Sequence, residues 1–122
     1  MTFEDFLDAV RNVASSDTSS DPDHWTLTNP LWGHCAVVSL LAQDVYGGEL
    51  MRGSLKNIPA YEYLRSHFWN RINGTEIDFT LEQYPDLSYT ELDGEERTRD
   101  SVLEHPDTVR RYRLLKSRFN KD

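Results

Sequence analysis

Cys35 is the only cysteine in this chain, and its position makes it the first candidate for chemistry. It opens the apolar run CAVVSLLAQDVY, which ends at Gly47 and Gly48, so the run predicts a buried helix that begins at Cys35. A helix N-terminus favours negative charge and therefore the reactive thiolate form of a cysteine. The alternative is a core-filling thiol, because cysteine is among the residue types most often buried.

A second group of candidates lies around the dipeptide Asn73-Gly74, which between two alternating runs is a strong signal for a β-hairpin. With a two-residue turn, His67 and Asp78 become diagonal neighbours on one face of the hairpin. Such positions lie roughly 7–8 Å apart, a separation that an imidazole and a carboxylate can close. Asp78 is therefore expected to orient His67, whose other nitrogen would face whatever packs on the sheet.

Taken singly, His67 is typical of a half-buried sheet histidine and Asp78 of an exposed or turn-capping carboxylate. Together with a helix-start cysteine, in the order Cys, His, Asp, they indicate nucleophilic catalysis. Cys35 would attack an amide or ester carbonyl, His67 would act as base and then as acid, and Asp78 would orient the ring. The Cys35 backbone N–H, with a second donor from His34 or Trp32, would stabilise the oxyanion.

The hairpin also carries a family resemblance. It reads HFW at 67–69 and, after Gly74, DFT at 78–80, which resembles the H-x-W and D-x-T pattern of transglutaminase-like domains. In those domains the cysteine begins a core helix, and the histidine and aspartate lie on neighbouring antiparallel strands. Papain-like enzymes share the order of the three residues. The resemblance implies a papain-like or transglutaminase-like α+β fold, with a buried Cys-bearing helix packed on a small antiparallel sheet.

A wider block of residues resembles the YunG-type family of uncharacterised bacterial proteins. This resemblance implies a similar small α+β fold but brings no established reaction. His34 stands where that family is expected to have glutamine, and either residue offers a polar side chain beside the cysteine. The block consists of Asn29-Pro30, Gly33-His34-Cys35-Ala36, Gln43-Asp44, Gly47-Gly48-Glu49, His67-Phe68-Trp69-Asn70 and Asp78-Phe79-Thr80.

The remaining segments supply the elements that must position these residues. An apolar stripe at helical spacing predicts an N-terminal helix, whereas the polar stretch 15–23 predicts an exposed loop or linker. A helix followed by strands with short connections favours α+β over alternating α/β architecture, with residues 1–122 as a single domain. The stripe consists of Phe3, Phe6, Leu7 and Val10.

Composition excludes several classes of function. Thirteen basic and 21 acidic residues give a net charge of −8, which argues against binding to nucleic acid or anionic membranes. No apolar run approaches the roughly 18 residues of a membrane span, and no secretory signal is recognisable, so a soluble cytoplasmic protein is expected. A single cysteine precludes an internal disulfide, and neither zinc nor calcium spacing is present, so no metal or cofactor is expected.

Basic residues concentrate near the C-terminus of this acidic chain. Cations toward the end of a helix are favourable, so the segment is expected to form a solvated helix face, with a dedicated anion site as the alternative. The residues are Arg110, Arg111, Arg113, Lys116, Arg118 and Lys121.

Two functions therefore remain open. The first is acyl transfer or amide hydrolysis through a thioester, on an unknown peptide, amide or small-molecule substrate, with water or an amine as acceptor. The second is a non-catalytic module on the same scaffold that binds a peptide or small molecule against Trp25, Trp32 and Trp69. The sequence does not choose between acceptors and does not indicate an oligomeric state.

Overall fold

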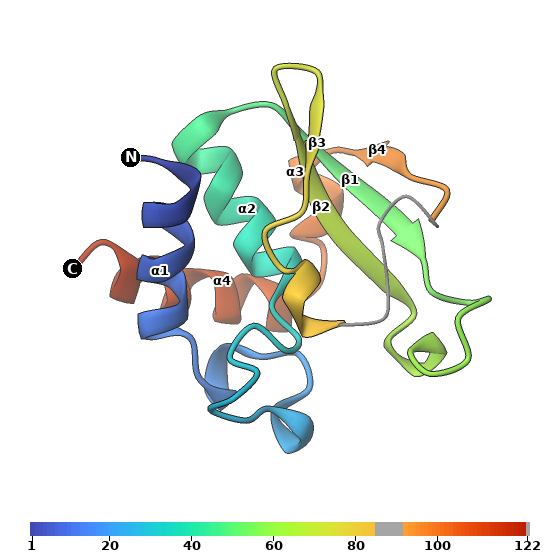
Figure 1. Ribbon diagram of the computed structural model, residues 1–122, viewed down its shortest axis with the longest axis horizontal. Helices are drawn as coiled ribbons and strands as arrows, with labels where there is room; N and C mark the ends of the chain where they lie inside the picture. Colours follow the sequence, from blue (N-terminus) through green and yellow to red (C-terminus); the bar gives the residue numbers. More distant parts are fainter. Residues whose placement is uncertain (85–91, 122) are drawn as a thin grey trace.

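The computed structural model describes residues 1–84 and 92–121 and places a group of helices beside an antiparallel sheet (Figure 1). The strand order is β3-β2-β1-β4, and the α+β class expected from the sequence is confirmed. The helices are α1 (Phe3–Val13), α2 (Cys35–Tyr46), α3 (Arg99–Val102) and α4 (Pro106–Phe119), and the strands are β1 (Glu49–Ser54), β2 (Ser66–Ile72), β3 (Thr75–Ile77) and β4 (Glu95–Arg97).

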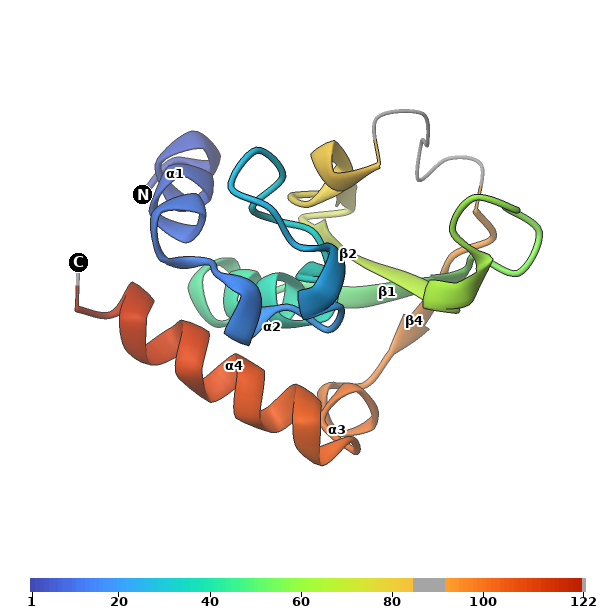
Figure 2. The same ribbon diagram turned by 90° about the horizontal axis from the view of Figure 1, so that it is seen from below.

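The central helix α2 packs on the sheet through its apolar residues, as its sequence predicts. The Asn70 side chain of β2 donates a hydrogen bond to the Ser39 carbonyl of α2 at 3.0 Å, which fixes the helix along that strand. Figure 2 shows α1 and α4 gathered around α2 on the side away from the strands. The apolar α2 residues buried in this core are Val37, Val38, Leu40, Leu41 and Ala42.

The predicted hairpin is confirmed in its turn and in the pairs next to it, whereas the second strand, expected over residues 75–80, is shorter and ends at Ile77. Ile72 pairs with Thr75, and Asn73 and Gly74 have φ of 52° and 79°, the left-handed values that a type I′ turn requires. Strand β3 is only three residues long, so the chain leaves the sheet at Asp78 and runs toward the start of α2 (Figure 1).

The two faces of β2 have different surroundings. Phe68 and Asn70 face the helices, whereas the alternating residues His67 and Trp69 lie on the opposite face. There Trp69 belongs to a second core, here called the aromatic cluster, and a Cβ at Gly94 would lie only 2.5 Å from its ring. The aromatic cluster comprises Trp32, Met51, Leu55, Trp69, Tyr84 and Leu92.

The N-terminal segment confirms one expectation and corrects another. Phe6 and Val10 are fully buried on the predicted face of α1, although Phe3 is 42% exposed. The expectation that the whole stretch 15–23 is exposed is wrong, because Thr18 and Ser19 are buried. Their hydroxyls form hydrogen bonds with His34 and with the Trp32 carbonyl, just before α2. A polar sequence pattern does not show whether its side chains bind water or buried groups of the protein.

The basic residues of α4 largely pair with carboxylates of the same chain. Arg118 binds Asp17 at 2.6 Å, and Arg111, which is nearly buried, binds Asp107 at 2.8 Å. These charges are therefore partly neutralised within the fold. Over the part of the chain that the structure describes, no helix is long and apolar enough to cross a membrane.

Candidate active site

His67 and Asp78 form a buried pair at the end of the hairpin. His67 Nε2 lies 2.6 Å from Asp78 Oδ2, and the two side chains are 0% and 1% exposed. The other carboxylate oxygen accepts the backbone N–H of Thr80 at 3.1 Å. Both oxygens of Asp78 are thus engaged, and the hydrogen bond to His67 fixes the orientation of the imidazole.

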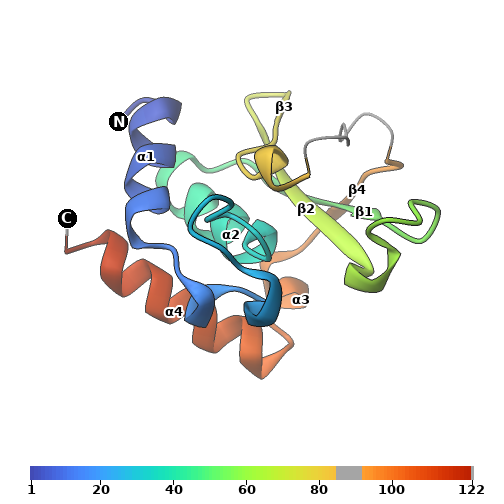
Figure 3. The same ribbon diagram turned by 60° about the horizontal axis from the view of Figure 1, so that its bottom comes forward.

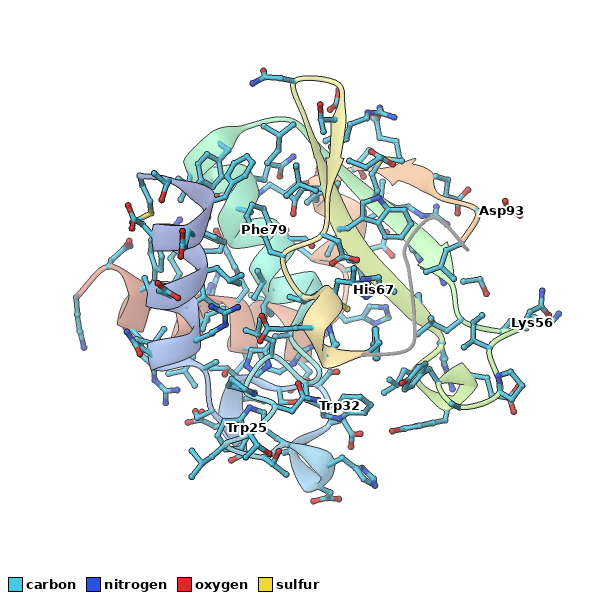
Figure 4. All side chains as sticks on the ribbon, in the orientation of Figure 1. Trp25, Trp32, Lys56, His67, Phe79 and Asp93 are labelled. Carbon is cyan, nitrogen blue, oxygen red and sulfur yellow. The ribbon has the colours of Figure 1, made fainter. Side chains whose placement is uncertain are left out.

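Aromatic rings enclose the remaining sides of His67. Trp69 stacks on the imidazole with a centroid separation of 5.9 Å, and Tyr84 meets it edge-on at 5.2 Å. Figure 4 shows His67 in the interior, between β2 and the start of α2. This enclosure limits the access of water to the ring.

The charge state of His67 follows from its neighbours. Burial by itself lowers the pKa of an imidazole, but the hydrogen bond to Asp78 and interaction with Cys35 outweigh it and raise the pKa of His67 to about 9. His67 is therefore an imidazolium at neutral pH, with Asp78 as its counter-ion.

Cys35 lies at the first position of α2 and is half-buried. The side chain of the preceding residue, His34, does not cap this helix. The first backbone N–H groups of α2, which begin at Cys35, therefore lack a capping partner from that side chain. Among the described residues His67 Nδ1 makes no regular hydrogen bond, yet the Cys35 thiol is close enough to raise the pKa of the ring. Catalytic hydrogen bonds are often long or poorly aligned before substrate binds.

The polar groups of the His34 side chain stabilise the loop that precedes α2. The ring is fully buried, with Nδ1 2.8 Å from the Trp32 carbonyl and Nε2 2.6 Å from the Thr18 hydroxyl. A carbonyl only accepts, so Nδ1 carries the proton, and Nε2 of the neutral ring is the acceptor nitrogen beside the Thr18 hydroxyl. Burial chiefly, with the nearby charge of Arg111, lowers the pKa of His34 to about 4.

Neither residue expected to supply a second oxyanion donor has one to spare. The backbone N–H of His34 binds the Leu31 carbonyl, and that of Trp32 binds the Asn29 carbonyl. The indole N–H of Trp32 donates to Asp21 at 3.0 Å. Both side chains instead stabilise the loop that precedes α2.

The neutral state of His34 predicts a loss of stability in mild acid. Its pKa is lower in the folded protein than the ordinary 6.5, so its contribution is complete above pH 6.5 and is lost as the pH falls toward about 4. The loss should be about 3 kcal/mol in the free energy of unfolding, measured by urea titration between pH 7 and 4.

The matched variant is His34→Gln, which cannot titrate. Its free energy of unfolding should change much less over the same range. Asp17, whose pKa falls to about 2 chiefly through its hydrogen bond to Arg118, loses its contribution only below about pH 4, outside this window. An equal slope in wild type and variant would contradict the assignment.

Sequence reasoning did not single out Gln83, although it lies beside the loop that leads to Cys35. Its Oε1 accepts the Gly33 backbone N–H at 2.9 Å, and the side chain is almost fully buried. Because Gly33 is the donor, the oxygen must face it, and the Nε2 group is left without a partner among the described residues. Figure 3 shows residues 81–84 beside the loop of residues 25–34.

The three tryptophans considered as ligand walls differ in position. Trp32 and Trp69 lie within the aromatic cluster, and Trp69 donates its indole N–H to Glu76 at 3.2 Å. Trp25 bonds the Pro30 carbonyl at 2.9 Å and lies further out on the loop (Figure 4). In residues 1–84 and 92–121, no three histidine, cysteine or acidic side chains are grouped to hold a metal ion.

These features define an α+β protein in which a helix-start cysteine lies beside a buried His–Asp pair. The chain belongs to the YunG family, whose model, described as YunG protein, matches residues 2–122. The Bacillus subtilis (strain 168) protein described as "Uncharacterized protein YunG" is 37% identical over 60 residues, which are 49% of this chain and 46% of that relative. The match therefore spans about half of that relative's length. No solved structure matches this chain.

Proposed function

We propose that this protein is a thiol enzyme that hydrolyses or transfers an acyl group through a thioester at Cys35, on a transglutaminase-like variant of the α+β fold. The observation that carries the proposal is the His67 ring. Asp78 holds one of its nitrogens at 2.6 Å, while the other makes no regular hydrogen bond among the described residues and interacts with the thiol of Cys35.

The proposed reaction begins with a Cys35 thiolate beside the imidazolium of His67. The sulfur attacks the carbonyl carbon of an amide or ester, and the carbonyl oxygen becomes an oxyanion. As the C–N or C–O bond breaks, His67 Nδ1–H gives its proton to the leaving amine or alkoxide. Water or an amine then attacks the thioester, His67 removes its proton, and the Cys35 thiolate leaves.

Asp78 acts on this reaction through His67. Its hydrogen bond to Nε2 keeps Nδ1 directed toward the thiol and stabilises the cationic ring. The charged ring in turn favours the thiolate over the thiol. The burial of both side chains strengthens these interactions, because electrostatic energies rise as water is excluded.

Two N–H groups are suited to stabilise the oxyanion. One is the Cys35 backbone N–H at the uncapped start of α2, and the other is the Gln83 side-chain amide. Gly33 fixes the Gln83 amide two residues before the nucleophile. Gln83 thus takes the role that the sequence assigned to His34 or Trp32.

Acylation of the Cys35 thiol by a simple ester tests this function. Mixing the protein with p-nitrophenyl acetate should place one acetyl group on Cys35, detected by intact mass and by release of p-nitrophenolate. Cys35→Ser should remain unmodified.

The second candidate, a module that binds a peptide or small molecule, is favoured by the complete burial of His67 and Asp78. It predicts a thiol that reacts only after unfolding.

The role of Gln83 makes a separate prediction. Gln83→Ala should slow acetylation of Cys35 by about 100-fold, because one donor to the oxyanion is lost. Alkylation by iodoacetamide forms no oxyanion, so its rate should stay within about twofold. The ratio of the two rate constants is the measurement.

Gln43→Ala is the matched control, because Gln43 lies near the opposite end of α2 and donates to the Gly48 carbonyl. It should leave the ratio unchanged. Gln83→Glu should slow acetylation further than Gln83→Ala, because a carboxylate repels the oxyanion. An unchanged ratio in both Gln83 variants would remove Gln83 from the mechanism.

A further inference from the structure

A cavity of about 350 Å³ lies on the helix-facing side of the sheet. Arg52 on β1 and Phe68 on β2 are cross-strand partners that line it, whereas His67 lies on the opposite face of β2. Neither Cys35 nor His67 is among the described residues that line the cavity. From β4 the chain passes through α3 into α4, and both helices contribute to the cavity wall (Figure 2). The cavity is therefore a second candidate site, separate from the one around Cys35.

The wall of this cavity combines buried and exposed side chains. Val102 of α3 and Thr108 of α4 are buried, and Phe68 is half-buried. Arg65 and Glu104 also line the cavity but are exposed, so they lie at its rim. A small molecule can therefore enter from solvent and reach apolar surface, and the volume is within the range of roughly 300–1,000 Å³ that is typical of ligand sites.

Three arginines line this cavity although the chain is acidic overall. Arg52 on β1 pairs with Glu95 on β4, so Arg97, two residues further along β4, is its diagonal neighbour on the same face. Arg65 immediately precedes β2 and forms no ion pair with any residue that the structure describes. Guanidinium groups from three segments of the chain are thus brought to one cavity, and the donors of Arg65 can bind a ligand.

A fourth arginine lies behind the cavity wall. Arg111 is only 4% exposed, and its Nη2 donates a hydrogen bond to the Thr108 hydroxyl at 3.2 Å. Because that oxygen accepts from Arg111, the hydroxyl proton of Thr108 can be donated to a ligand in the cavity. The Nη1 group of Arg111 is buried without a hydrogen-bond partner among the described residues. The wall therefore has positive charge behind it as well as at its surface.

The carboxylates at this cavity do not balance its arginines. Glu104 lines the cavity, and Glu95 pairs with both of the strand arginines. Asp107, the partner of Arg111, is shared with Arg110. Four arginines therefore face three carboxylates, one of which pairs with a further arginine, and the excess charge is positive. Helix α4, whose first turn lines the cavity and has no side-chain cap, adds the positive end of its dipole.

We propose that this cavity binds a small organic acid, with its carboxylate on the arginines and its hydrocarbon part against Phe68 and Val102. A guanidinium group binds the two oxygens of a carboxylate in parallel. The small excess of positive charge suits a singly charged carboxylate better than a doubly charged phosphate. The apolar part of the wall favours an organic acid over an inorganic ion. This site goes beyond the proposed function and does not depend on it.

Titration with 4-phenylbutyrate tests the proposal. In nuclear magnetic resonance spectra of the labelled protein, the backbone amide signals that shift should concentrate at residues lining the cavity, such as Ser66, Ser101 and Thr108. The uncharged 4-phenylbutanamide, which has the same skeleton, should bind at least about tenfold more weakly, because it makes no charged hydrogen bond. Shifts confined to other parts of the protein would overturn the proposal. Tighter binding of 3-phenylpropyl phosphate would overturn the carboxylate assignment.

Three exposed residues provide variants that should fold like the wild type. Arg65→Gln should raise the Kd of 4-phenylbutyrate about tenfold, whereas Glu104→Gln should lower it about threefold, because the first removes an attractive charge and the second a repulsive one. Arg113→Gln is the matched control, since Arg113 lies outside this cavity, and its Kd should equal that of the wild type. Cys35→Ser should also bind equally, which separates this site from the proposed thiol chemistry. Equal Kd values in wild type, Arg65→Gln and Glu104→Gln would overturn the proposal.

Discussion

Replacing His67 with alanine should slow the reaction of Cys35 with iodoacetamide at pH 6 by about 100-fold. In the proposed mechanism the imidazolium of His67 stabilises the thiolate, whereas an ordinary thiol with a pKa of about 8.5 is only about 0.3% ionised at that pH. The measurement is the second-order rate constant of alkylation, followed by intact mass from pH 5 to 9.

The shape of the pH profile carries as much information as the rate. The pKa of His67 is about 9, so the imidazolium persists through neutral pH and the wild-type rate should be nearly flat between pH 6 and 8. In His67→Ala the rate should rise about tenfold per pH unit over this range, as the free thiol ionises.

A second histidine provides the control for this experiment. His24 is 65% exposed and pairs with Asp21, so His24→Ala should alkylate like the wild type. Circular dichroism in the far and near ultraviolet establishes that each variant is folded, and His67→Gln keeps a polar side chain in the same space. Coincident profiles for wild type and both His67 variants would show that Cys35 is not coupled to His67 and would favour the binding module.

The part of the site that could be predicted from the sequence is the part built by local rules. The Asn73-Gly74 turn sets the register of the hairpin, and alternation along β2 then determines which residues share a face. These two facts place His67 and Asp78 close enough to predict their contact, although Asp78 itself lies just past the end of β3. Helix α2 likewise follows from the sequence, because the apolar run begins at Cys35 and ends at two glycines.

The remaining parts depend on contacts between distant segments. Gln83 meets Gly33 across 50 positions of the chain, and nothing in the local pattern of either residue indicates the other. His34 reads as a polar residue before a helix, yet Thr18 and a backbone carbonyl satisfy its ring in the interior. Hydrophobic periodicity describes the faces of elements and does not identify such polar partners.

The place of β4 in the sheet could not be anticipated for a related reason. Arg52 and Arg97 become neighbours because β4 pairs with β1, at the opposite edge of the sheet from β3. Strand β4 is three residues long and reads EER, without the apolar alternation that predicts a strand. Its pairing with β1 depends on the assembled sheet.

Removing Asp78 should have the largest effect on stability among the changes considered, because it leaves the buried His67 without its counter-ion. Asp78→Ala should lower the free energy of unfolding at pH 6 by about 3–5 kcal/mol, as measured by urea titration. Asp78→Asn should cost less, since the amide oxygen still accepts a hydrogen bond from His67. Asp8→Ala is the control, because Asp8 forms an exposed pair with Arg11 worth less than about 1 kcal/mol.

The pH dependence of this loss distinguishes an ion pair from mere packing. The pKa of His67 is raised from 6.5 in the unfolded chain to about 9, so the stabilisation is complete below pH 6.5 and disappears as the pH rises through 9. The difference in unfolding free energy between wild type and Asp78→Asn should therefore be greatest at pH 6 and shrink toward pH 9.5. A difference that stays constant over this range would mean that His67 is neutral in the folded protein, and the thiolate–imidazolium mechanism would lose its basis.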